Sequence, residues 1–190
     1  MIKIDRINTI SNHLSFSRIV LTIPILYFLY NLEQGDYHSI FAAILMVLAA
    51  VTDYLDGYFA RKYDEVSELG KIIDPLADKF AIGVIVIILY LKNVLPEFIL
   101  IIVIARDILI FFGGLIISNK IGKVLPSNLL GKITVFILGI YLLLLVLGLN
   151  DFPTIFNMFN ILIIFMSVIS LIGYFIRSIE ALRYKKNELL

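Results

Sequence analysis

The chain has 190 residues, 61% of them hydrophobic, and its mean hydropathy is +0.99. A soluble domain is closer to half apolar, so this composition excludes an ordinary soluble protein and indicates a single integral membrane domain over residues 1–190. The net charge of +1 gives no reason to expect a nucleic-acid partner, and the absence of cysteine excludes disulfide bonds.

Six long apolar runs follow one another along the chain, each close to the roughly 20 residues that a helix needs to cross a bilayer. We expect helices because an open sheet leaves its backbone polar groups unsatisfied in lipid. Arg18 and Pro24 interrupt the first run, which is therefore the weakest of the six. The predicted spans are Leu14–Leu32, Tyr37–Ala60, Ile72–Leu91, Phe98–Ser118, Leu129–Leu149 and Thr154–Ile176.

A short amphipathic stretch precedes the first span. Ile4, Ile7 and Ile10 have a loosely helical spacing, and charged and polar residues lie between them. This pattern is typical of a helix that lies on the membrane surface, with an unstructured tail as the alternative. The predicted fold class is therefore an all-α membrane protein of six transmembrane helices with a short N-terminal interfacial helix, ending in a basic tail from Arg177.

Lysine and arginine are distributed unequally between the two sides of the predicted membrane domain. The loops on one side carry only Lys92, whereas the side that holds both termini carries Lys3, Arg6, Arg61, Lys62, Lys71, Lys120, Lys123, Arg183, Lys185 and Lys186. Because positively charged loops stay in the cytoplasm, we expect the termini and the loop between the second and third spans to face it.

Four aspartates flank that loop, beside two strongly apolar segments. Asp53 and Asp56 are three residues apart and share a helix face, and Asp74 and Asp78 are four apart at the predicted start of the third helix. Pro75 between them is tolerated in a first helical turn. If the two helices are antiparallel, the four carboxylates converge near the cytoplasmic surface, where they are costly unless a cation or a function holds them.

Divalent cations would neutralise such a cluster. All-oxygen ligands favour Mg²⁺, Mn²⁺ or Ca²⁺, and four carboxylates could hold two metals of the kind used in phosphoryl transfer. Arg61 would then bind a phosphate oxygen, and Gly57 and Ala60 would leave room for a bulky ligand group. The alternative, that the carboxylates only solvate a helix end, is favoured for the acidic residues inside the loop, Asp64, Glu65 and Glu68.

The same stretch resembles the signature of the CDP-alcohol phosphotransferases, D-x2-D-G-x2-A-R-x8-G-x3-D-x3-D. It matches at every fixed position, namely Asp53, Asp56, Gly57, Ala60, Arg61, Gly70, Asp74 and Asp78. Eight fixed positions match by chance about once in 10¹⁰ starting points at average residue usage. The resemblance implies a six-helix membrane enzyme, commonly a homodimer, that transfers the phosphatidyl or phospho-alcohol group of a CDP-alcohol to an alcohol and releases CMP.

The resemblance also implies roles for the motif residues. Asp53, Asp56 and Asp74 would bind a pair of Mg²⁺ or Mn²⁺ ions, and Asp78 would contact one metal and act as the base that takes the proton of the acceptor hydroxyl. The CMP moiety of the donor, CDP-diacylglycerol, would be held by Gly57, Ala60 and Arg61, with Ser67 and Gly70 lining the same nucleotide site.

Other stretches bear on the acceptor. SNHLSFSRIVLTIP, AAVTDYLDGYFAR and GKIIDPLADK resemble the bacterial phosphatidylglycerophosphate synthases, which use glycerol 3-phosphate and lie in the bacterial cytoplasmic membrane. IARDILI has Asp107 where those synthases carry glutamate, GKIT lacks their second lysine, and an Arg–Asp pair also resembles the cardiolipin synthases, which use phosphatidylglycerol. A phosphate-bearing acceptor needs cations, so we expect Arg106, Lys132 and Lys123 to bind it. The alternatives are a structural pairing of Arg106 with Asp107 or another helix, and a role of Lys132 as an ordinary cytoplasmic flank.

Two other classes of function remain open. A cation transporter or channel would use the aspartates as an ion path, but such a path needs charges distributed across the membrane, and these gather at one face. A non-catalytic lipid-binding relative is the other alternative, which the complete motif disfavours.

Overall fold

The computed structural model describes the backbone of residues 10–63, 70–122, 129–149 and 152–188, and side chains within 20–55, 58, 79–122, 129–149 and 152–185. Every element in these ranges is helical, which confirms the all-α class. The chain forms two compact units. The first unit comprises Met1–Val94 with Leu145–Leu149, and the second comprises Leu95–Leu144 with Asn150–Leu190.

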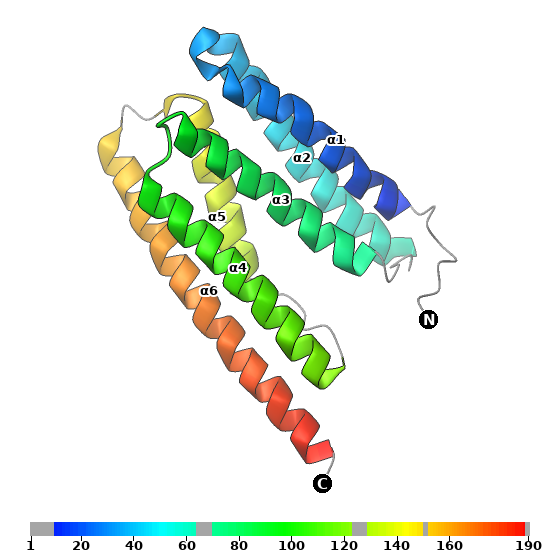
Figure 1. The fold of residues 1–190 in the computed structure, drawn as a ribbon. Helices are drawn as coiled ribbons and strands as arrows, with labels where there is room; N and C mark the ends of the chain where they lie inside the picture. The colour runs from blue at the N-terminus through cyan, green and yellow to red at the C-terminus, as the bar shows by residue number, and fades with distance from the viewer. Residues whose placement is uncertain (1–9, 64–69, 123–128, 150–151, 189–190) are drawn as a thin grey trace. The chain divides into compact units, whose positions relative to one another are not determined.

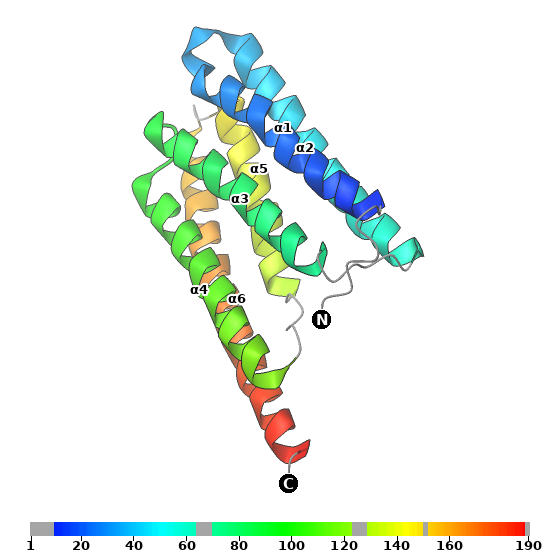
Figure 2. The same ribbon diagram turned by 45° about the vertical axis from the view of Figure 1, so that its right-hand side comes forward.

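In the first unit, two helices pack on α1 (Ile10–Tyr30). These are α2 (Asp36–Tyr63), which forms an antiparallel hairpin with α1, and α3 (Gly70–Leu91), as Figures 1 and 2 show. The side chains that these helices bury are mostly small or aliphatic, among them Ile25 and Leu29 on α1, Ala42 and Ala43 on α2, and Val86 and Leu89 on α3. Pro24 lies inside α1 without ending it, as expected for a single helix through this run.

The connection from α1 to α2 is tight and polar. It contains η1 (Leu32–Gln34), a single turn of 3-10 helix, and Gly35, whose φ of 139° is a conformation that favours glycine. Lys92, just past the end of α3, lies 3.4 Å from the Glu33 carboxylate and 4.6 Å from the centre of the Tyr30 ring. The charge of Lys92 therefore links the end of α3 to the turn between α1 and α2.

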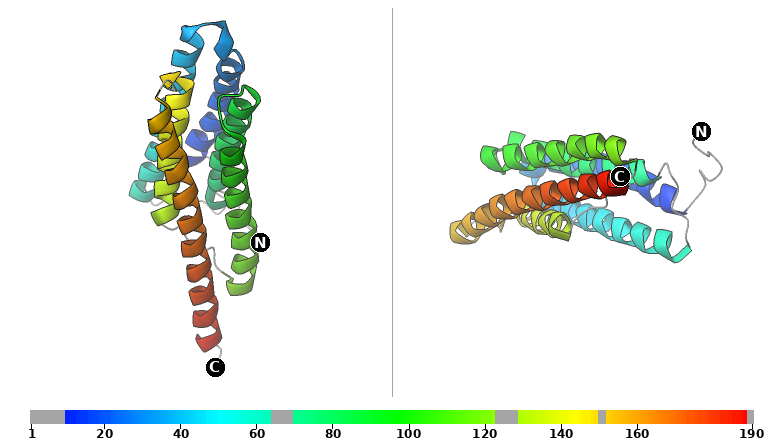
Figure 3. Two further views of the ribbon diagram at one scale, coloured as in Figure 1. Left: turned by 90° about the vertical axis from the view of Figure 1, so that its left-hand side faces the viewer. Right: turned by 90° about the horizontal axis from the view of Figure 1, so that it is seen from below.

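The second unit consists of α4 (Glu97–Ile121), α5 (Leu129–Val146, up to Leu144) and α6 (Pro153–Glu188). Helices α4 and α6 lie side by side and run in the same direction, and α5 runs opposite to both (Figures 1 and 3). A Cβ atom at Gly114 would lie 3.0 Å from the hydroxyl oxygen of Tyr174, so the small residue allows α4 and α6 to approach closely.

Among the described residues, four segments are long and apolar enough to cross a membrane: Asp36–Leu55, Glu97–Ile121, Leu129–Val146 and Pro153–Lys185. Two shorter apolar segments, Val20–Tyr30 and Lys79–Leu91, lie within α1 and α3. These lengths support an integral membrane protein, while the crossing of all six helices stays a prediction. The expected interfacial helix lies outside the described residues.

Two expectations about helix ends are wrong. The basic tail does not follow the sixth helix but continues it to Glu188, because residues 177–188 contain no glycine or proline and many strong helix formers. Helix α3 begins at Gly70 rather than Ile72, which places Pro75 in its second turn instead of its first. Proline there has no N–H to donate to the carbonyl of Lys71.

Candidate active site

The aspartate motif occupies two helix ends in the first unit. Asp53, Asp56, Gly57, Ala60 and Arg61 lie in the C-terminal part of α2. The remaining fixed positions, Gly70, Asp74 and Asp78, begin α3. Only six residues join the helices, so both parts of the motif lie at the same end of this unit (Figure 1).

Helical spacing places the aspartates in two pairs, each on one helix face. The Asp53 side chain is solvent-exposed. The side chains of the other seven motif residues, and the whole of Ser67 and Lys123, lie outside the described part of the chain. Among the side chains that are described, no three potential metal ligands come together, so the predicted metal cluster stays a prediction that rests on the chemistry of its four carboxylates.

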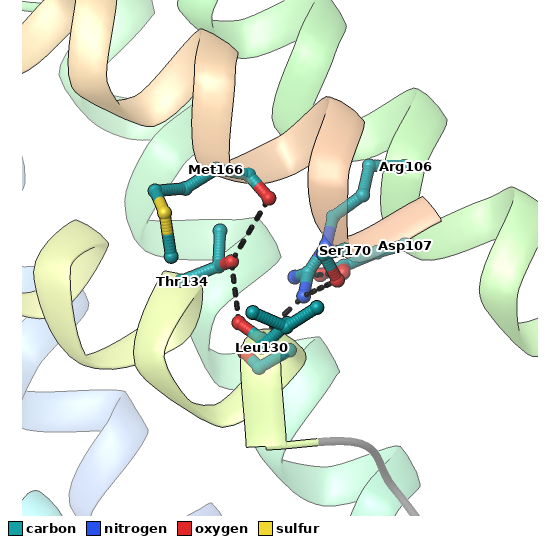
Figure 4. Close-up of polar contacts among 7 residues, drawn as sticks. Arg106, Asp107, Leu130, Thr134, Met166 and Ser170 are labelled. Carbon is teal, nitrogen blue, oxygen red and sulfur yellow. Dashed lines mark hydrogen bonds and ion pairs between the residues drawn. The ribbon is translucent and has the colours of Figure 1, made fainter. Parts of the chain in front are cut away.

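A second polar site lies inside the second unit, around Arg106 on α4 (Figure 4). Its guanidinium is buried, with 4% of the residue exposed. Nη1 donates a hydrogen bond to Oδ1 of Asp107 at 2.8 Å, and Nη2 donates to Oγ of Ser170 on α6 at 3.1 Å and to the carbonyl of Gly131 on α5 at 3.3 Å. One buried cation therefore contacts all three helices of the unit.

The beginning of α5 is held by a neighbouring contact. The Thr134 hydroxyl lies 2.7 Å from the carbonyl of Leu130 in its own helix and 3.2 Å from that of Met166 in α6 (Figure 4). Thr134 is buried, so this link between α5 and α6 is shielded from solvent. This contact holds the first turn of α5, which contains the Gly131 carbonyl that Arg106 binds, against α6.

The three expected acceptor residues are placed differently. Arg106 is buried and paired with Asp107, so the structural pairing named as the alternative is present. Lys132 is exposed on α5, directly after the residue whose carbonyl Arg106 binds. The sequence interpretation missed Ser170, although a serine inside an apolar transmembrane run is a signal for a hydrogen bond between helices.

The sequence model described as CDP-alcohol phosphatidyltransferase matches residues 8–175, which include the complete aspartate motif, Arg106 and Lys132. The chain belongs to this family. The resemblance found from eight motif residues is therefore confirmed over most of the chain.

Individual relatives agree with this assignment. A CDP-diacylglycerol–glycerol-3-phosphate 3-phosphatidyltransferase from Rickettsia felis is 35% identical over 147 residues, 77% of this chain and 78% of the relative. A protein of the same name from Aquifex aeolicus is 30% identical over 178 residues, 90% of this chain and 96% of the relative. A CMP-forming cardiolipin synthase from Streptomyces coelicolor is 33% identical over 71% of this chain and 63% of the relative.

Membership in the CDP-alcohol phosphatidyltransferase family makes this protein an enzyme of phospholipid biosynthesis. Enzymes of this family transfer the phosphatidyl group of CDP-diacylglycerol to an alcohol acceptor. The apolar helices place this reaction in a membrane. Relatives with two different names, glycerol-3-phosphate 3-phosphatidyltransferase and cardiolipin synthase, share this family.

Proposed function

We propose that the protein transfers the phosphatidyl group of CDP-diacylglycerol to glycerol 3-phosphate, giving phosphatidylglycerophosphate and CMP. The complete eight-residue motif at the adjoining ends of α2 and α3 carries this proposal. The names of the relatives from Rickettsia felis and Aquifex aeolicus support glycerol 3-phosphate as the acceptor.

The donor set fits a pair of hard cations. Asp53, Asp56, Asp74 and Asp78 offer only carboxylate oxygens, which suit Mg²⁺ or Mn²⁺, and the exposed side chain of Asp53 leaves this group accessible from water. When bound, the two ions would stabilise charge on the diphosphate and on the departing phosphate.

The other roles in the reaction are assigned to individual residues of the motif and its loop. Asp78 takes the proton of the acceptor hydroxyl as general base. The hydroxyl oxygen forms a bond to the phosphorus that carries diacylglycerol, the diphosphate P–O bond breaks, and CMP leaves with the bridging oxygen. Arg61 and the small residues Gly57 and Ala60 hold the CMP moiety, and Ser67 and Gly70 line the nucleotide site.

The phosphate of the acceptor requires cations of its own. Arg106 supplies a guanidinium that three helices hold in place, and a fixed planar donor set suits phosphate oxygens. Lys132 is exposed one residue from the Gly131 carbonyl and adds a mobile charge, and Lys123 is proposed as the third cation.

A second acceptor, phosphatidylglycerol, is supported by two observations. The Streptomyces coelicolor relative is named a cardiolipin synthase, and the Arg106–Asp107 pair that resembles this branch of the family forms in the structure, at 2.8 Å. The donor and the motif chemistry are the same in both cases, so only the acceptor distinguishes the two functions.

We further propose a bacterial cytoplasmic membrane as the location, with six crossings, both termini and the motif facing the cytoplasm, and a homodimer as the working form. The excess of lysine and arginine on the side of the termini supports this orientation. The dimer follows from the family resemblance alone.

The acceptor is tested with purified protein in mixed micelles that contain CDP-diacylglycerol. Glycerol 3-phosphate, phosphatidylglycerol and free glycerol are supplied separately, and lipid products are identified by mass spectrometry alongside CMP release. We expect phosphatidylglycerophosphate with glycerol 3-phosphate. Cardiolipin formed from phosphatidylglycerol would replace the proposed acceptor, and ion flux in liposomes without any CMP would overturn the enzyme assignment.

Removing divalent metal should stop the reaction. We expect EDTA to reduce CMP release to the background rate and Mg²⁺ or Mn²⁺ to restore it, because the proposed ions would stabilise the charge on the diphosphate and the departing phosphate. Asp53→Asn should need a higher Mg²⁺ concentration for half-maximal rate. Full activity in EDTA after extensive dialysis would contradict the two-metal proposal.

A further inference from the structure

The buried guanidinium of Arg106 has more N–H donors than it has hydrogen bonds to the described residues. A guanidinium carries five N–H donors, and three hydrogen bonds, all from the Nη atoms, go to Asp107, Ser170 and Gly131. The Nε atom is buried and has no hydrogen-bond partner among the described residues. A buried charged donor without a partner is unfavourable, so this N–H calls for an explanation.

The contacts of the Nη atoms fix the direction of that donor. Asp107 is the next residue on the same helix, so by itself it leaves the guanidinium free to pivot about the ion pair. Ser170 and Gly131 lie on two other helices, 64 and 25 residues away in sequence, and both bind Nη2. Ser170 is fully buried and fixed within α6. Two acceptors on Nη2 and one on Nη1 define the plane of the group.

We propose that Ser170 is a positioning residue, which orients the Arg106 guanidinium so that its Nε–H is free to donate to an anionic phosphate oxygen of the acceptor. The proposal rests on the proposed function. The ligand chemistry is a phosphate oxygen, and both glycerol 3-phosphate and phosphatidylglycerol supply one. Ser170 itself touches neither the substrate nor the reacting atoms.

A neighbouring serine provides a matched control. Ser167 lies three residues before Ser170 on α6 and is equally buried, with 1% of the residue exposed. Its Oγ has no hydrogen-bond partner among the described residues. Ser167→Ala and Ser170→Ala therefore remove the same atom from the same helix, but only the second removes a contact with Arg106.

The test measures steady-state kinetics with whichever of the two acceptors supports CMP release. We expect Ser170→Ala to raise the KM for the acceptor about tenfold. A misoriented Arg106 loses the hydrogen bond from its Nε–H to the acceptor phosphate, and one hydrogen bond to a charged group has about this effect. The kcat and the KM for CDP-diacylglycerol should stay within about twofold, since this change loosens binding of the acceptor alone. Ser167→Ala should leave all three constants unchanged.

A double-mutant cycle separates positioning from general packing. In Arg106→Lys, which lacks the Nε donor, Ser170→Ala should produce no further rise in the acceptor KM, because residues that act through one contact are not additive. Ser170→Cys, which is nearly isosteric and a weak acceptor, should give an intermediate KM and serves if the alanine variant does not accumulate.

Each result supports or overturns the proposal. An unchanged KM in Ser170→Ala, an equal rise in Ser167→Ala, or the same rise in both Arg106 backgrounds would show that Ser170 does not act through Arg106. Failure of the proposed function is recognised separately, because the wild-type enzyme would then release no CMP with either acceptor. That result would also overturn the positioning role of Ser170.

Discussion

Asp78→Asn is expected to abolish CMP formation from CDP-diacylglycerol, with a loss of at least about 10³ in kcat. Asparagine has the size of aspartate but cannot take a proton from the acceptor hydroxyl, and it removes one of the four carboxylates of the proposed metal site. The rate is measured as CMP released by purified protein at saturating donor, acceptor and Mg²⁺.

Asp36→Asn is the matched control for this substitution. Asp36 is exposed in the first turn of α2, far along that helix from the motif, so neutralising it should leave the rate unchanged. Thermal unfolding of both variants in the same detergent shows whether either has lost its fold. Robust CMP formation by folded Asp78→Asn would show that Asp78 is not the base.

Arg106→Ala is expected to damage both stability and acceptor binding. The truncation removes the guanidinium that binds the half-buried carboxylate of Asp107 and the buried hydroxyl of Ser170. Breaking one side of a buried ion pair costs about 3–5 kcal/mol of unfolding free energy. We also expect the KM for the phosphate-bearing acceptor to rise about 100-fold, while the KM for CDP-diacylglycerol stays near the wild-type value.

Lys132→Ala tests the mobile cation beside this site. Because Lys132 is exposed, its removal should change the acceptor KM by only about threefold and leave the unfolding temperature unchanged. An Arg106→Ala enzyme with unchanged apparent affinity for glycerol 3-phosphate would reduce Arg106 to a structural residue that joins three helices.

The sequence predicted the helices well because their signal is local. A run of about 20 apolar residues indicates a span without reference to the rest of the chain. Most of each predicted span lies within one observed helix. The ends were harder. The helix end near Glu188 depends on local helix propensity rather than hydropathy, which changes at Arg177 while the helix continues.

The two sites differ in how far the sequence could predict them. The aspartate motif has fixed spacing over 26 residues, so one window contains it, and its placement on two helix ends follows from the apolar runs on either side. The surroundings of Arg106 come from residues up to 64 positions away. No local pattern pairs Arg106 with Ser170 or Gly131, because that choice depends on how α4, α5 and α6 pack.

The parallel course of α4 and α6 has an electrostatic consequence. Peptide dipoles give the C-terminal end of each helix a partial negative charge, and here both C-terminal ends point the same way, with α6 continuing past the end of α4 (Figure 3). The Lys185 ammonium, in the last turns of α6, donates a hydrogen bond of 2.6 Å to the Lys120 carbonyl near the end of α4. In the antiparallel hairpin of α1 and α2 the dipoles oppose each other and need no such counter-charge. Dissolved salt therefore weakens the ends of α4 and α6 more than that hairpin.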